Sequence, residues 1–127
     1  MDRDWWLKGG GFDLWSIPHF LFGVLMGMLP LLTGVSFVMG CVFTAFLAVS
    51  WEVFEKSILR VRETTQNVIL DVVLALLGYA LVAHLLFLYP LHRQDAWMTF
   101  IAIGVLYLFM NLSGWLAYRR RQRDLMP

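Results

Sequence analysis

Charged residues are scarce in this chain: Asp, Glu, Lys and Arg make up 15% of its 127 residues, whereas 60% are hydrophobic. With a mean hydropathy of +0.69, the chain has too little polar surface for an ordinary soluble domain of this size. Cysteine is nearly absent too, and the single Cys41 cannot form an intrachain disulfide. No HExxH or other known catalytic signature is present, so no motif assigns a reaction. The basic residues form no patch interleaved with aromatic residues, which argues against nucleic acid as a partner.

The hydrophobic residues are concentrated in four stretches, at about residues 17–32, 35–59, 67–89 and 97–118. A helix needs about 20 predominantly apolar residues to cross the hydrocarbon core of a bilayer. Lipid offers the backbone no hydrogen-bond partners, so these spans are expected to be helices. We therefore predict an all-α polytopic membrane protein, in which residues 1–127 form a single domain of four transmembrane helices. The first span is expected to be retained, because no small-residue cleavage site follows it.

Local signals predict several helix ends. Ser16 with Pro18 is typical of a helix start, and Thr64 or Thr65 is suited to cap the third span. The stretch 29–34 contains proline and glycine, and it predicts a tight hairpin between the first two spans.

Nine of the ten basic residues fall at one end of the predicted spans, and Arg93 is the exception. The nine are Arg3, Lys8, Lys56, Arg60, Arg62, Arg119, Arg120, Arg121 and Arg123. Positively charged residues near span ends stay in the cytoplasm. We therefore expect both termini and the loop between the second and third spans to lie inside, with the other two loops outside. The basic run near the carboxyl terminus is also suited to hold anionic membrane lipids.

Each of the first three spans carries a stripe of small and polar residues at spacings of three and four, which place them on one helix face. The stripes are His19, Gly23, Gly27 and Pro30 in the first span, Gly40, Thr44, Ala48, Glu52 and Glu55 in the second, and Asn67, Asp71, Ala75 and Gly78 in the third. Small residues let membrane helices approach closely, so these positions predict helix packing. The polar members end the stripes at the cytoplasmic side, where we expect them to converge between the three helices.

This polar cluster has two interpretations. Its members suit an internal salt-bridge network, in which Lys56 pairs with Glu52 at the favourable i,i+4 spacing. They equally suit a metal, headgroup or proton site, because charged groups inside a membrane are costly. The candidate metal or catalytic residues are His19, Glu52 and Asp71, and the candidate phosphate ligands are Arg60, Arg62 and Asn67. Imidazole with carboxylates suits several divalent ions, and guanidinium groups suit the phosphate of a phospholipid or polyprenyl-phosphate headgroup.

Several of these residues resemble the VanZ-like membrane proteins and allied small bacterial families of mostly unknown function. The similar positions are Ser16, His19 and Gly23, then Trp51, Glu52 and Glu55, then Arg60, Arg62 and Glu63, and finally Asn67, Asp71 and Gly78. The similarity covers residues 14–80 and implies a small polytopic bundle in the bacterial cytoplasmic membrane, with its charged residues near one membrane face. Many VanZ-like chains are longer, and a Ser or Asp is often expected within 64–66, where this chain has Thr, Thr and Gln.

Three functional classes stay open from the sequence, including whether the protein is an enzyme at all. The first is a membrane-embedded protein that binds a divalent metal or a lipid headgroup, with or without catalysis. The second is a small oligomeric transporter of the small-multidrug type, in which Glu52 is the embedded carboxylate. The third is a structural subunit or adaptor that docks another membrane protein. Membrane lipids are expected partners in each case.

Overall fold

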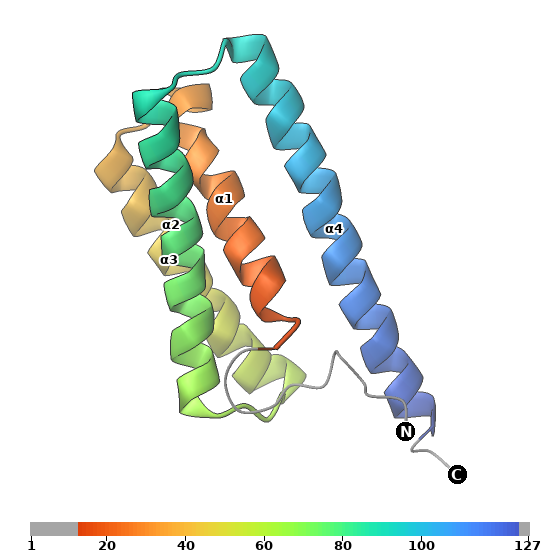
Figure 1. Cartoon of the computed structure of the whole chain (residues 1–127). Helices are drawn as coiled ribbons and strands as arrows, with labels where there is room; N and C mark the ends of the chain where they lie inside the picture. Colours follow the sequence, from red (N-terminus) through yellow and green to blue (C-terminus); the bar gives the residue numbers. More distant parts are fainter. Residues whose placement is uncertain (1–12, 125–127) are drawn as a thin grey trace.

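The computed structural model describes residues 13–124, which form four long helices and no strands (Figure 1). They are α1 (Ser16–Thr33), α2 (Phe37–Phe54), α3 (Thr65–Leu88) and α4 (Arg93–Asp124), and α2 continues as a short π-helix, η1 (Glu55–Leu59). The predicted all-α fold with four helices is confirmed, and all four helices are long and apolar enough to cross a membrane. Arg3 and Lys8, two of the nine basic residues expected on the cytoplasmic side, lie outside the described residues.

Hydroxyl side chains begin two of the helices as capping rules require. The Thr64 hydroxyl accepts a hydrogen bond from the backbone N–H of Asn67 at 3.2 Å, which confirms the predicted cap of α3. Ser36 caps α2 in the same way through the N–H of Met39, also at 3.2 Å. Helix α1 begins at Ser16 as predicted, although its N-cap is Trp15 and no side chain caps it.

The hairpin predicted over 29–34 is misplaced. Helix α1 continues through Pro30 to Thr33, and the turn follows it at Gly34–Ser36. Gly34 adopts a φ of 76°, which glycine tolerates without strain, and its N–H donates to the carbonyl of Pro30 at 3.1 Å. The glycine therefore ends the helix, while the proline is accommodated inside it.

Helix α1 is the centre of the bundle, and it packs against each of the other three helices. Its closest partner is α3, because glycines remove side chains from the contact. A Cβ on Gly23 would overlap the carbonyl oxygen of Ala75, and a Cβ on Gly78 would overlap that of Phe20. A Cβ on Gly27 would lie 2.7 Å from the carbonyl oxygen of Tyr79. The predicted role of the small-residue stripes in helix packing is confirmed at these positions.

Tyr79 joins α3 to the start of α2 and was not singled out in the sequence. Its side chain is fully buried, and its hydroxyl donates to the carbonyl of Phe37 at 2.6 Å. Gly40 makes room for this hydroxyl, because a Cβ there would overlap it. The bond connects α3 to the first turn of α2 and positions α2 along α3.

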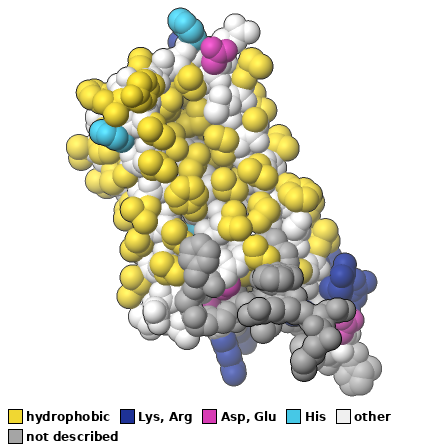
Figure 2. All heavy atoms as spheres, in the orientation of Figure 1, with side chains coloured by type: hydrophobic (Ala, Val, Ile, Leu, Met, Phe, Trp, Pro, Cys, Tyr) yellow, Lys and Arg dark blue, Asp and Glu magenta, His cyan; other side chains and the backbone are white. Residues whose placement is uncertain are grey.

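Helix α4 stands at the side of the bundle (Figure 1). It packs against α1 and, within the described residues, makes no close backbone approach to α2 or α3. Apolar side chains cover the middle of the molecule (Figure 2). One end of the bundle, here called the basic end, holds the beginning of α1, the connection between α2 and α3, and the end of α4. Its described cations are Lys56, Arg60, Arg62, Arg119, Arg120, Arg121 and Arg123, whereas Arg93 lies at the opposite end.

Candidate functional site

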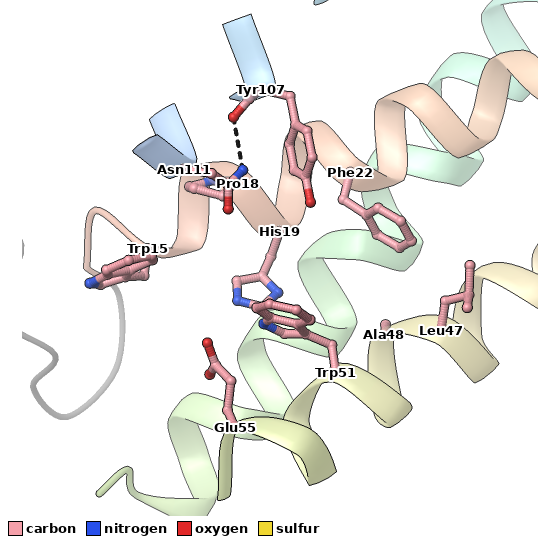
Figure 3. Close-up of a pocket in the computed structure, with 10 residues that line it drawn as sticks. All are labelled: Trp15, Pro18, His19, Phe22, Leu47, Ala48, Trp51, Glu55, Tyr107 and Asn111. Atoms are coloured by element: carbon pink, nitrogen blue, oxygen red, sulfur yellow. Dashed lines mark hydrogen bonds between the residues drawn. The ribbon is translucent and has the colours of Figure 1, made fainter. Parts of the chain in front are cut away.

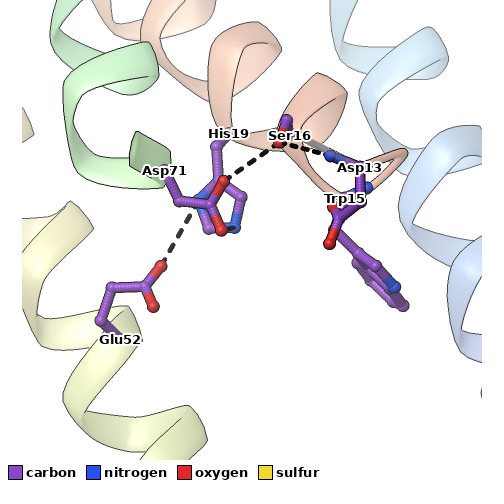
Figure 4. Close-up of polar contacts among 6 residues, drawn as sticks. All are labelled: Asp13, Trp15, Ser16, His19, Glu52 and Asp71. Carbon is purple, nitrogen blue, oxygen red and sulfur yellow. Dashed lines mark hydrogen bonds and ion pairs between the residues drawn. The ribbon is translucent and has the colours of Figure 1, made fainter. Parts of the chain in front are cut away.

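Three polar side chains from three helices meet near the basic end (Figure 4). His19 of α1 lies between Glu52 of α2 and Asp71 of α3. Its Nδ1 is 3.7 Å from Oε1 of Glu52, and its Nε2 is 3.5 Å from Oδ2 of Asp71. The side chain of His19 is 10% exposed, while those of Glu52 and Asp71 are 4% and 0% exposed. The convergence expected from the three stripes is therefore present in the structure.

The first turn of α1 holds Asp71 in place. The Ser16 hydroxyl lies 3.4 Å from Oδ1 of Asp71 and donates to it. The same hydroxyl oxygen accepts from the backbone N–H of Asp13 at 3.3 Å, and the Asp13 carboxylate accepts from the N–H of Trp15 at 2.9 Å. Ser16 appeared in the sequence as a helix start, and its contact with Asp71, 55 positions away, depends on the packing of α1 against α3.

A π-helical turn follows Glu52 and brings further carboxylates to the same place. Within η1 the backbone is wider than in an α-helix, and such turns are frequent at functional sites. The turn ends at Arg60, which has a positive φ of 52°, and the chain then returns toward α3. Glu55 is buried, and Glu52, Glu55 and Glu63 each offer an oxygen within 4.8 Å of the others. Glu52 therefore belongs to two groups of possible ligands.

The predicted phosphate ligands have two different environments. Asn67 is fully buried, one helical turn before Asp71 on α3. Arg60 and Arg62 are exposed on the connection between η1 and α3. Their binding of phosphate stays a prediction. The expected pairing of Lys56 with Glu52 also stays a prediction, because Lys56 is exposed whereas Glu52 is buried.

The distances from His19 to Glu52 and Asp71 are compatible with two arrangements of the cluster. Both distances are longer than a good hydrogen bond and lie within the range of an ion pair. A protonated imidazole would satisfy both carboxylates. Alternatively, one ring nitrogen of His19 and an oxygen of each carboxylate would together hold a metal ion, since these three atoms lie within 4.8 Å of one another. Ligands about 2.0–2.6 Å from an ion lie roughly 3–4 Å apart, which compares with the 4.8 Å within which these three atoms lie.

A pocket of about 210 Å³ lies beside the cluster (Figure 3). Its walls come from α1, α2 with η1, and α4, and they include His19, Trp51 and Glu55. On α4, the side-chain amide of Asn111 donates to the carbonyl of Tyr107 at 2.8 Å, and both residues line the pocket. The histidine of the cluster is therefore accessible from the side of the bundle that faces α4.

No family model, curated protein or solved structure matches the chain. The resemblance to VanZ-like proteins therefore stays an expectation drawn from the motif residues. The function has to be inferred from the geometry of the cluster itself.

Proposed function

We propose that this protein binds a divalent cation between α1, α2 and α3, near the inner face of a bacterial cytoplasmic membrane. One observation carries the proposal: a nitrogen of His19 and an oxygen each of Glu52 and Asp71 all lie within 4.8 Å of one another. These atoms come from three different helices, so the bundle brings them together rather than a local turn.

The types of ligand support a divalent ion. Imidazole and carboxylate together suit several transition-metal ions, and Glu55 and Glu63 offer further oxygens beside Glu52. Carboxylates buried in an apolar bundle are costly as free charges, and a bound cation compensates for that cost. Ser16 supports the site from outside by holding Asp71 toward the imidazole.

A divalent ion at this site would have a chemical use at a membrane surface. A bound divalent ion polarises a phosphate oxygen and makes coordinated water a nucleophile near neutral pH. A phosphate ester of a lipid headgroup is the substrate class that this chemistry fits, with Arg60, Arg62 and Asn67 as the expected phosphate ligands. The proposal requires binding of the ion, and catalysis is its extension.

Elemental analysis of the purified protein tests the ion. After purification without chelator and supplementation with divalent ions, wild-type protein is expected to hold about one equivalent of metal per chain. His19→Ala and Glu52→Gln each remove a ligand and are expected to lose it. His92→Ala is the matched control, because His92 is exposed at the opposite end of the bundle and is expected to leave the metal in place.

Two results would contradict the proposal: wild-type protein without metal after supplementation, or full metal content in a well-folded Glu52→Gln protein. Either result would leave the salt-bridge interpretation, in which a protonated His19 neutralises its neighbours. The transporter and adaptor alternatives stay predictions. A functional dimer would favour the former, and a tightly co-purifying membrane protein the latter.

A further inference from the structure

A second pocket adjoins the first and extends it toward the basic end. It has a volume of about 450 Å³ and shares Trp15, Trp51, Glu55 and Asn111 with the pocket beside His19. The two pockets together are called the lateral groove here. One wall is α2 with η1 and the other is α4, two helices that make no close backbone approach to each other within the described residues. The groove is therefore a feature of the bundle's flank.

The groove changes character along its length. Its deeper part is lined by Phe22, Leu47 and Ala48, which offer hydrocarbon surface. Toward the basic end it is lined by Trp15, Trp51, Trp115 and Tyr118. Aromatic side chains with this distribution suit the boundary between acyl chains and headgroups. An occupant with an apolar tail and a polar head at one end fits this gradient.

The wide part of the groove has a charge of each sign on opposite walls. Glu55 lies on the η1 wall and is 5% exposed, while Arg121 lies on the α4 wall. The faces of tryptophan rings attract cations, most strongly where water is excluded. The Arg119 guanidinium already lies 4.9 Å from the centre of the Trp115 ring, whereas Trp15 and Trp51 line the groove beside Glu55. Arginine binds phosphate through its planar guanidinium. The two walls thus complement a headgroup that carries an ammonium and a phosphate.

We propose that the lateral groove binds one zwitterionic phospholipid, with the acyl chain toward Phe22 and Leu47, the ammonium among the tryptophans beside Glu55, and the phosphate at Arg121. This proposal goes beyond the cation site and rests mainly on residues of α4, with Glu55 shared between the groove and the carboxylate cluster. It does not require that an ion be bound at His19.

Lipid retention measured by native mass spectrometry tests the proposal. The protein is reconstituted with equal amounts of phosphatidylethanolamine and phosphatidylglycerol, transferred to mild detergent, and its bound lipids are counted. Wild-type protein is expected to retain one phosphatidylethanolamine per chain. Trp115→Ala and Arg121→Gln are each expected to weaken this retention by about tenfold, because the first removes an aromatic wall of the groove and the second a charge-assisted contact.

The chain offers a matched control for each variant. Trp97 is 41% exposed, similar to Trp115 at 49%, but lies at the opposite end of α4, so Trp97→Ala is expected to retain the lipid. Arg123 is exposed and does not line the groove, so Arg123→Gln controls for general loss of positive charge. Glu55→Gln is expected to reduce the preference for phosphatidylethanolamine. Because Glu55 also belongs to the carboxylate cluster, the α4 variants are decisive.

Three outcomes would overturn the proposal. The first is equal retention of both phospholipids, which would show that the headgroup is not recognised. The second is equal loss in Trp115→Ala and Trp97→Ala, which would place the lipid elsewhere. The third is full competition by water-soluble glycerophosphoethanolamine, which would show a site for the free headgroup. Retention in Glu52→Gln protein is expected to match wild type, so failure of the cation site and failure of the groove are distinguishable.

Discussion

Gly23 lies in a close contact between α1 and α3, and its missing side chain is what permits the contact. A Cβ at this position would overlap a backbone carbonyl of Ala75, which has no free end to move aside. We expect Gly23→Ala to lower the free energy of unfolding by about 1–3 kcal/mol, as overpacking usually does. Unfolding in mild detergent, followed by tryptophan fluorescence, measures the change.

Gly104 provides the control for this substitution. It lies inside α4, and a Cβ there would meet nothing within 4 Å. Gly104→Ala is expected to change stability by less than about 1 kcal/mol, and in the favourable direction, because alanine is the better helix former. Equal effects of the two substitutions would show that the close approach of α1 and α3 does not limit stability.

Tyr79 shows how one helix positions another. Its hydroxyl bond to the carbonyl of Phe37 connects the middle of α3 to the first turn of α2, and the two rings also pack with centroids 5.4 Å apart. We expect Tyr79→Phe to keep the ring packing and lose the hydrogen bond, at a cost of about 0.5–1.5 kcal/mol in unfolding free energy.

The same detergent unfolding experiment with Tyr89→Phe controls for removal of a hydroxyl group. Tyr89 follows the end of α3 and is 73% exposed, so its substitution is expected to leave stability unchanged. If Tyr79→Phe were equally silent, the position of α2 would depend on the apolar contacts alone. Nothing in the sequence indicated this role of Tyr79, because its partner Phe37 is 42 positions away.

The expected orientation of the whole bundle rests on its charge asymmetry and is directly testable. In a Cys41→Ser background, we expect a membrane-impermeant maleimide to label His92→Cys in intact cells and Arg62→Cys only after permeabilisation. Both positions are exposed, so accessibility to the reagent depends on the side of the membrane. Labelling of Arg62→Cys in intact cells would reverse the expected topology.

The helices and their inward faces were predictable from local pattern. A bilayer accepts few backbone solutions, so apolar length alone predicts four helices, and spacings of three and four place the stripes on one face. The ends were less predictable: α4 extends past 97–118 on both sides, and α2 changes to a π-helix at Glu55. Neither the extension of α4 nor the π-helix has a simple signal in the sequence. Hydropathy does not distinguish the polar end of a helix from a loop.

The amino-acid sequence by itself determined the class of the fold, the asymmetry of charge and the presence of polar residues at one end of three stripes. The tertiary structure decided which of them meet. His19 lies between Glu52 and Asp71, and Ser16 reaches Asp71, because glycines allow α1 and α3 to pack at one particular depth and rotation. The groove between α2 and α4 likewise arises from the way α4 packs on α1. Distances between helices depend on packing of the whole bundle, which no local pattern contains.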